Sequence, residues 1–283
     1  MGKADLAFVQ PQPIAPRPRT GEGSEVRARP LVGKADLHLH TAHSDGMASV
    51  AELIEHLEAR TDLDVIAVTD HDSLRGALDA RERWAHGSYR FEVVPGMEVT
   101  TIEGHLLALF IEEPVPCLRG VEETVDAVHR LGGLCVIPHP FTWMTRGMGL
   151  RHIRRVLANK ADGVGFDGIE TTNDTPAGRI GAAKAKALNS REFGLAEVGG
   201  SDAHFLACIG AGYTEFEGRT AADLRLAILN RSTRGVTVQH PSLREIGYGQ
   251  VVRQTYRGIM STPRVLGWGP TAASFVRRMF AVR

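Results

Sequence analysis

Cysteines, aromatic residues and long apolar stretches are all scarce in this sequence. Only three of the 283 residues are cysteines, with no Cys-x-x-Cys pair, and this odd count favours a reducing compartment with packed thiols. No apolar run approaches the roughly 18 to 20 residues that span a bilayer. Pro11 and Pro13 stand where a signal peptide would need leucines. We therefore expect a folded, cytoplasmic protein without a transmembrane segment.

The formal net charge is zero, but the charge is unevenly distributed. Residues 1–35 carry six Lys or Arg against three Asp or Glu, and residues 241–283 carry seven Arg against one Glu. The segment between them is therefore net acidic, which suits a centre that binds cations. The basic C-terminal segment could contact RNA, nucleotides or a membrane surface. Because glycines and prolines interrupt its helical period, we favour packing against the barrel or a second subunit.

The chain divides into three segments. Residues 1–34 contain five prolines and no regular period, which predicts an extended arm. Residues 35–240 alternate short apolar runs with amphipathic stretches, a pattern typical of a parallel sheet or barrel. Residues 241–283 form a basic appendage in which we expect two short helices, because glycines and prolines break the period. The expected strands are 35–40, 65–70, 91–98, 105–111, 134–138, 168–172, 195–200 and 235–239, and the expected helices are 49–59, 74–84, 121–131, 150–158, 177–192 and 221–230.

Metal-ligating residue types follow most of the predicted strands. In parallel α/β barrels the carboxyl ends of the strands meet at one mouth, where active sites are built. In His38-x-His40 the strand period of two places both imidazoles on one face, about 6 to 7 Å apart, which suits one ion. A carboxylate such as Glu98 can bridge two ions. The motifs are Asp36-Leu-His-Leu-His40 with Ser44-Asp-Gly46, Thr69-Asp-His-Asp72, Pro95-Gly-Met-Glu98, Pro138-His-Pro140 and Gly200-Ser-Asp-Ala-His204.

Together these motifs resemble those of the PHP (polymerase and histidinol phosphatase) domain family. The resemblance covers about residues 35–240. Within it, residues 98–109 are similar to the stand-alone metallohydrolase branch rather than to the polymerase or histidinol phosphatase branches. The resemblance implies a distorted (β/α)7 barrel, two or three divalent ions (Mn, Zn or Fe) and hydrolysis of phosphoesters.

The resemblance also implies a ligand set. In some relatives the acid of the first motif, Asp45 in this chain, is a histidine. The aspartate makes the third ion position richer in oxygen, which either weakens the binding of the third ion or shifts its identity toward Mn or Fe. Transferred motif by motif, the first ion takes His38, His40, Glu98 and Asp202, the second takes Glu98, His105 and His139, and the third takes Asp45, His71 and His204.

The implied mechanism uses a hydroxide held between ions, which attacks phosphorus in line. It needs no serine or cysteine nucleophile, and the sequence has neither a Gly-x-Ser-x-Gly elbow nor a Gly-rich phosphate loop ending in Lys-Ser/Thr. Asp70 and Asp72 flank His71, so one of them is a candidate to orient that imidazole or to handle protons. The alternative is that both are surface acids in a turn.

Three further residues are candidates for contact with the substrate. A phosphate usually meets an arginine as well as metal. Arg146 lies in a Gly-rich loop after His139 and is a candidate for both binding and catalysis, while Arg179 lies early in a predicted helix. Asn173 ends a predicted strand and could hydrogen-bond a substrate; a turn-forming role is the alternative.

We therefore predict a metal-dependent phosphoesterase that acts on small phosphomonoesters, nucleotides or short oligonucleotides. One alternative is a carboxylester, carbamate or amide hydrolase, because the same hydroxide can attack a carbonyl. Another is a non-catalytic, metal-stabilised scaffold whose basic ends bind a partner. The complete ligand set argues against the scaffold, which would have no need of every ligand.

Overall fold

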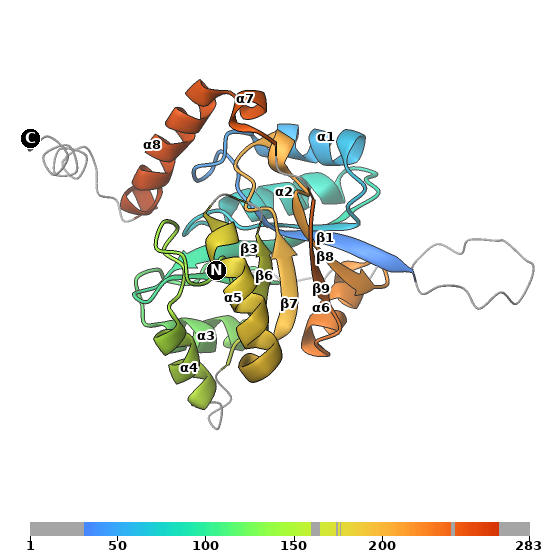
Figure 1. Cartoon of the computed structure of the whole chain (residues 1–283). Coiled ribbons are helices and arrows are strands. Elements are labelled where there is room, and N and C mark those ends of the chain that lie inside the picture. Colours follow the sequence, from blue (N-terminus) through green and yellow to red (C-terminus); the bar gives the residue numbers. More distant parts are fainter. Residues whose placement is uncertain (1–30, 160–164, 174, 176, 239–240, 266–283) are drawn as a thin grey trace, which may run out of the picture.

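A single sheet organises the part of the chain that the computed structural model describes, residues 31–159, 165–173, 175, 177–238 and 241–265 (side chains to 260). Its nine strands follow the order β7-β6-β5-β4-β3-β2-β1-β8-β9. In Figure 1 the two edge strands, β7 and β9, lie near each other. The strands are β1 (Val32–Leu39), β2 (Val65–Val68), β3 (Glu92–Thr100), β4 (His105–Leu109), β5 (Leu134–Ile137), β6 (Gly168–Asn173), β7 (Ala196–Gly200), β8 (Gly212–Glu217) and β9 (Arg234–Thr237). The helices are α1 (Val50–Arg60), α2 (Arg75–Ala85), α3 (Val121–Arg130), α4 (Leu150–Ala158), α5 (Gly178–Leu188), α6 (Ala221–Leu229), α7 (Leu243–Ile246) and α8 (Tyr248–Val265), with short helical turns at Asn189–Phe193 and Leu206–Cys208.

Four of the eight pairs of neighbouring strands run parallel and four run antiparallel, because two strands, β4 and β8, reverse direction. The trio β1-β2-β3 and the trio β5-β6-β7 are parallel. β4 is antiparallel to β3 and β5, and β8 is antiparallel to β1 and β9. Only residues 101–104 join β3 to β4, too few for the crossover of a dozen or more residues that parallel strands require. The parallel arrangement is therefore interrupted at β4 and at β8, a strand that the sequence pattern did not predict.

The sheet curls until β7 meets β8, so it is an almost closed barrel. The Thr214 hydroxyl on β8 accepts the Gly199 N–H of β7 at 3.0 Å and donates to the Gly199 carbonyl at 2.9 Å. Only glycine fits at this crossing, because a Cβ on Gly199 would lie 2.2 Å from the carbonyl oxygen of Tyr213. A bridge between Leu39 and Ala203 also joins β1 to the segment after β7. The expectation of a distorted α/β barrel is confirmed.

Alternate strand residues face two apolar layers, as the period of two requires. Val65, Ala67 and Leu107 belong to the layer inside the barrel. Ile66 and Val68 belong to the layer that packs under helices α1 to α5. Apolar side chains therefore cover both faces of these strands.

The C-terminal segment differs from expectation. Instead of two short helices, the four-residue α7 is followed by α8, which has 18 residues. Pro263 lies in the last turn of α8, where the loss of one backbone hydrogen bond leaves the earlier turns intact. The predicted arm lies outside the described residues up to residue 30, as do Arg277 and Arg278 of the basic segment.

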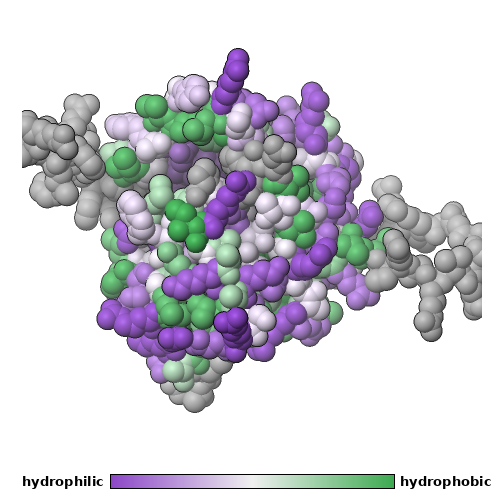
Figure 2. All heavy atoms as spheres, viewed as in Figure 1, coloured by the Kyte–Doolittle hydropathy of each residue, from purple (hydrophilic) through white to green (hydrophobic). Residues whose placement is uncertain are grey.

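The outer surface is mixed in polarity. On the face shown in Figure 2, hydrophobic side chains form small separate groups among hydrophilic ones. No helix in the described part of the chain has the length and apolar character needed to cross a membrane. The side chains that could bind cations lie mainly at the barrel mouth.

Candidate metal centre

His38, on β1, and His40, directly after β1, face the barrel mouth because the strand is irregular. Leu37 packs in the inner layer, whereas Leu39, two residues later, packs in the outer layer. The register of β1 against β2 shifts between Asp36 and Leu39, as a β-bulge produces. His38 and His40, on either side of Leu39, therefore both point into the barrel mouth, with their ring centroids 5.1 Å apart.

Glu98, on β3, lies at the centre of the cluster and is fully buried. Each of its carboxylate oxygens faces a different group of imidazoles. A carboxylate placed in this way can bridge two ions. Oε1 lies 2.7 Å from His105 Nδ1 and 3.0 Å from His139 Nε2, and Oε2 lies 3.1 Å from His38 Nε2, 3.2 Å from His71 Nδ1 and 3.3 Å from His40 Nε2.

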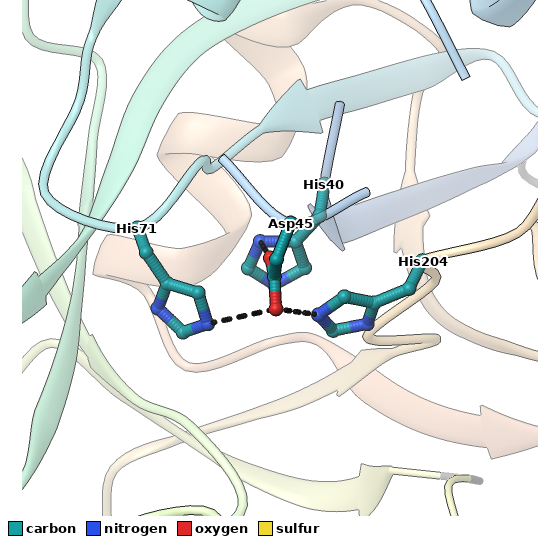
Figure 3. Close-up of side chains that lie close together, drawn as sticks. All are labelled: His40, Asp45, His71 and His204. Atoms are coloured by element: carbon teal, nitrogen blue, oxygen red, sulfur yellow. Dashed lines mark hydrogen bonds and ion pairs between the residues drawn. The ribbon is translucent and has the colours of Figure 1, made fainter. Parts of the chain in front are cut away.

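A second carboxylate, that of Asp45, faces three imidazoles beside this centre (Figure 3). Asp45 Oδ2 lies 3.0 Å from His204 Nε2 and 3.8 Å from His71 Nε2. Asp45 Oδ1 lies 3.6 Å from His40 Nδ1. These four residues come from the segments that follow β1, β2 and β7, and they offer ligand atoms that all lie within 4.8 Å of one another.

Asp202 closes the cluster on the side of β7. Its Oδ1 lies 3.3 Å from His40 Nε2 and 3.5 Å from His38 Nε2. Asp202 has a φ of 52° and His139 a φ of 25°. A non-glycine residue held at a positive φ costs on the order of 1–3 kcal/mol of folding free energy, and such residues cluster at functional sites. The chain is therefore strained at two of the positions that carry candidate ligands.

The chemistry of these donors fits divalent cations. Both ring nitrogens of His40 are buried without a hydrogen bond, and His105 Nδ1 approaches Glu98 without hydrogen-bonding geometry. Burial lowers the pKa of His40, but the carboxylates of Asp202 and Glu98 more than offset burial and raise it to about 10. Burial opposes ionisation of Glu98, but the surrounding imidazoles, His71 first, hold its pKa well below the usual range. Three ionised carboxylates are thus enclosed by imidazoles, a set of ligands suited to cations.

Sequence reasoning missed Glu170, which supports two of the candidate ligands. Its Oε1 lies 2.8 Å from His38 Nδ1, and its Oε2 accepts the backbone N–H of His139 at 2.7 Å. Asn173 donates to the same Oε2 at 2.9 Å, and its own oxygen accepts the N–H and hydroxyl of Thr175. An acidic residue in the middle of a predicted buried strand was the available signal for Glu170.

Asp70 and Asp72 are buried and turned toward neighbouring loops. Asp70 accepts the Thr41 N–H at 2.7 Å and the Thr41 hydroxyl at 2.6 Å, and it also accepts the Ser44 hydroxyl. Asp72 accepts the Thr100 N–H at 2.7 Å. The two carboxylates therefore hold the chain on either side of the cluster.

The two candidate arginines are exposed. Arg146 lies in the loop after β5, where its carbonyl accepts the His105 N–H at 3.0 Å. In the same loop the Thr145 hydroxyl lies 3.1 Å from His139 Nδ1. Arg179 lies in the first turn of α5. The structure thus brings the nine candidate ligands together and leaves the arginines at the surface.

Comparisons with known proteins extend the resemblance. Residues 36–160 match the PHP domain family and residues 184–233 match the PHP-associated family. The uncharacterized protein MJ1587 of Methanocaldococcus jannaschii is 30% identical over 129 residues, which cover 42% of this chain and 74% of that protein. The 5'-3' exoribonuclease Rnm of Salmonella typhimurium is 32% identical over 88 residues, which cover 30% of each chain.

The fold has a solved counterpart as well. It is a two-domain protein from Bacteroides vulgatus that contains a predicted PHP-like metal-dependent phosphoesterase. The TM-score is 0.59 at 21% identity, and the alignment covers 74% of this chain and 66% of that one. On its motifs, its barrel and these matches, the chain belongs to the PHP domain family.

Proposed function

We propose that this protein is a metal-dependent phosphoesterase whose substrates are small phosphomonoesters, nucleotides or short oligonucleotides. The observation that carries the proposal is the position of Glu98, whose two oxygens each face a separate group of imidazoles within 3.3 Å. This arrangement suits two adjacent ions that share one carboxylate, as in enzymes that displace groups at phosphorus.

The residues divide into three sets around Glu98. Divalent ions bound there would activate water and stabilise negative charge on the phosphoryl oxygens. The first set shares Glu98 Oε2 and Asp202, the second shares Glu98 Oε1, and the third surrounds Asp45. The sets are His38, His40, Glu98 and Asp202; Glu98, His105 and His139; and Asp45, His71 and His204.

Outer partners keep these ligands in place. Glu170 fixes the ring orientation of His38 and the backbone of His139. Because Asn173 donates to Glu170, we assign it to this support rather than to the substrate. Asp70 acts in the same way on the loop that carries Asp45, through its bonds to Thr41 and Ser44. Such partners set ligand geometry without touching the reacting atoms.

The exposed arginines are the proposed contacts for the substrate's phosphate. The Arg146 carbonyl accepts the His105 N–H, and the Arg146 guanidinium donates to the Thr101 carbonyl at 3.4 Å, so this arginine lies on a loop that is itself tied to the cluster. A guanidinium can bind a phosphate through two parallel hydrogen bonds. Arg179, at the start of α5, is the second candidate. The matched relative named as an exoribonuclease supports phosphodiester substrates.

The proposal is tested by hydrolysis of two substrates that release the same reporter. The purified protein, reconstituted with Mn²⁺, is assayed with p-nitrophenyl phosphate and p-nitrophenyl acetate, and then with mononucleotides and short oligonucleotides. We expect turnover of the phosphate esters, loss of turnover in Glu98→Gln, and wild-type turnover in His56→Ala. Turnover of the acetate alone would replace the proposal with a carboxylester hydrolase. No turnover of either substrate class by fully metal-loaded protein would reject a hydrolase.

A further inference from the structure

Helix α8 contacts the loop that carries Asp45, although the two are far apart in sequence. Gln254 Nε2 donates to Asp45 Oδ2 at 3.0 Å. Arg257 donates to the backbone carbonyls of Ala42 at 2.8 Å and Ser44 at 3.2 Å. The C-terminal helix therefore reaches the rim of the candidate metal centre rather than standing apart from it.

The contact is made by one face of the helix. Gln254, Arg257 and Gly258 are spaced three and four residues apart, which places them on a common face. All three are partly buried, whereas Val252 and Tyr256 on α8 are 71% and 56% exposed. A Cβ on Gly258 would lie 2.9 Å from Asp45 Oδ2, closer than real contacts allow. The helix thus packs against the Asp45 carboxylate as closely as a residue without a side chain permits.

The same carboxylate oxygen serves both the helix and the candidate ligands. Asp45 Oδ2 accepts from Gln254 and lies 3.0 Å from His204 Nε2 and 3.8 Å from His71 Nε2. Asp45 itself is nearly fully buried. Because Asp45 lies on a loop after β1 rather than on the strand, its side chain depends on its neighbours for orientation. Gln254 hydrogen-bonds Oδ2, the oxygen that faces His204 and His71, whereas the Ser44 hydroxyl donates to Oδ1 at 3.3 Å.

A glutamine is well suited to this position. An arginine or lysine there would compensate the charge of the carboxylate and compete with a cation for it. The amide donates a neutral hydrogen bond, so it restricts the carboxylate and leaves its negative charge in place. In metal sites, partners of this kind change metal affinity by about 10- to 100-fold when removed.

We propose that α8 is a wall of the metal centre and that Gln254 is a positioning residue for the ion held by Asp45, His71 and His204. The inference rests on the proposed function, because it assumes that this group binds an ion. Gly258 has the companion role of keeping the space in which the carboxylate lies.

The test is metal binding rather than catalysis. The metal-free full-length protein is titrated with Mn²⁺ by isothermal calorimetry, and bound metal is counted by elemental analysis after desalting. The variants are Gln254→Ala and Gly258→Ala. The control is Gln250→Ala, an exposed glutamine one helical turn earlier on α8. Thermal unfolding of each metal-free variant checks that the fold is retained.

We expect Gln254→Ala to bind its weakest ion about 10- to 100-fold less tightly than the wild type and to keep the tighter ions. Gly258→Ala should weaken the same ion, although alanine is the better helix former. Gln250→Ala should match the wild type. Unchanged isotherms in both Gln254→Ala and Gly258→Ala, or an equal loss in the control, would overturn the inference. A wild type that binds fewer than two ions would instead overturn the proposed function.

Discussion

The barrel mouth and the cluster of His129, Cys135 and Asp167 both bring three or more potential ligand atoms within 4.8 Å of one another. In the second cluster, Asp167 Oδ2 accepts the Cys135 N–H at 2.7 Å and lies 2.9 Å from His129 Nε2. The Cys135 thiol lies in the apolar layer under the helices, where burial raises its pKa well above the usual range. This cluster holds one carboxylate, and that carboxylate has partners.

The barrel mouth differs from this cluster in its number of buried charges and in its buried polar atoms that lack a hydrogen bond. Three carboxylates, those of Asp45, Glu98 and Asp202, are ionised there among imidazoles, and both nitrogens of His40 lack a hydrogen bond. Proximity of metal-ligating residue types is common to both regions. Of the two regions, only the mouth holds several buried carboxylates whose charge is compensated by imidazoles with a raised pKa, and a divalent cation could balance the same negative charge in place of those protons.

Removing a carboxylate at the mouth is the most severe test of this contrast. Glu98→Gln keeps the shape of the side chain but removes the charge that faces five imidazoles, and Asp202→Ala removes a carboxylate from the β7 side. We expect each variant to lose hydrolysis by more than about a hundredfold, beyond the effect typical of an outer partner, and to bind less metal. His56→Ala, on α1, should change neither. Equal activity in all three variants would contradict the site assignment.

Removing Glu170 should have the next largest effect. Glu170→Gln cannot accept as a carboxylate from both His38 and the His139 backbone, so two ligands lose their fixed orientation. Metal affinity, measured by competition with a chelator, should fall about 10- to 100-fold. Glu197→Gln, on the neighbouring β7, is the control and should bind metal as the wild type does. Wild-type affinity in Glu170→Gln would show that His38 and His139 keep their orientation without the Glu170 carboxylate.

The pH dependence of stability should separate the metal-free from the metal-loaded protein. In the metal-free fold the pKa of His40 is raised from 6.5 to about 10. Its protonation therefore stabilises the fold fully below about pH 6.5, and this stabilisation is lost as the pH rises toward 10. His71, whose pKa burial lowers to about 4, changes stability only below pH 6.5.

Bound cations replace those protons, so the loaded protein escapes this loss. We expect the difference in unfolding temperature between loaded and metal-free protein to widen from pH 6.5 to pH 9. Thermal scans of both forms across this range measure it. A difference that narrows over the same range would show that protons do not stand in for cations at the mouth.

How much of the fold and of the site could be predicted from the sequence depends on whether the contacts that determine them leave a local pattern. The motifs at the strand ends predicted the residues that gather at the mouth, because the ends of neighbouring strands converge whatever lies between them. The bulge between Asp36 and Leu39 could not be predicted, since an apolar and histidine alternation looks the same with or without it. The reversal of β4 was readable in principle from its short connection to β3.

The features that the sequence did not predict depend on contacts between residues far apart in the chain. Glu170 was passed over because a single acid in a strand carries no spacing signal, and its role appears only when β6 lies beside β5. The contact between Gln254 and Asp45 spans 209 residues. Glycines and proline in the C-terminal segment suggested broken helices, yet Gly258 lies where the helix approaches the Asp45 carboxylate and Pro263 lies in its last turn. The same residue types serve close packing and helix termination, so composition could not separate the two.

The smallest expected effect is a loss of stability on changing the cluster of His129, Cys135 and Asp167. Asp167 raises the pKa of His129 mainly through their hydrogen bond, so the charged pair stabilises the fold below about pH 6.5 and the contribution is lost as the pH rises through the folded-state pKa. His129→Gln keeps a neutral donor and removes the charge. Because the two side chains are 28% and 18% exposed, the cost should be at most about 1 kcal/mol.

That cost should be greatest near pH 5.5 and absent near pH 9, as measured by denaturant unfolding of wild type and variant at both values. The same cost at both values would assign it to packing instead of charge. Metal content should not change in His129→Gln, because Asp167 keeps its bond to the Cys135 N–H and the thiol stays neutral. A lost ion in this variant would erase the contrast between the two clusters, since it would mean that a cation binds where the carboxylate is already satisfied.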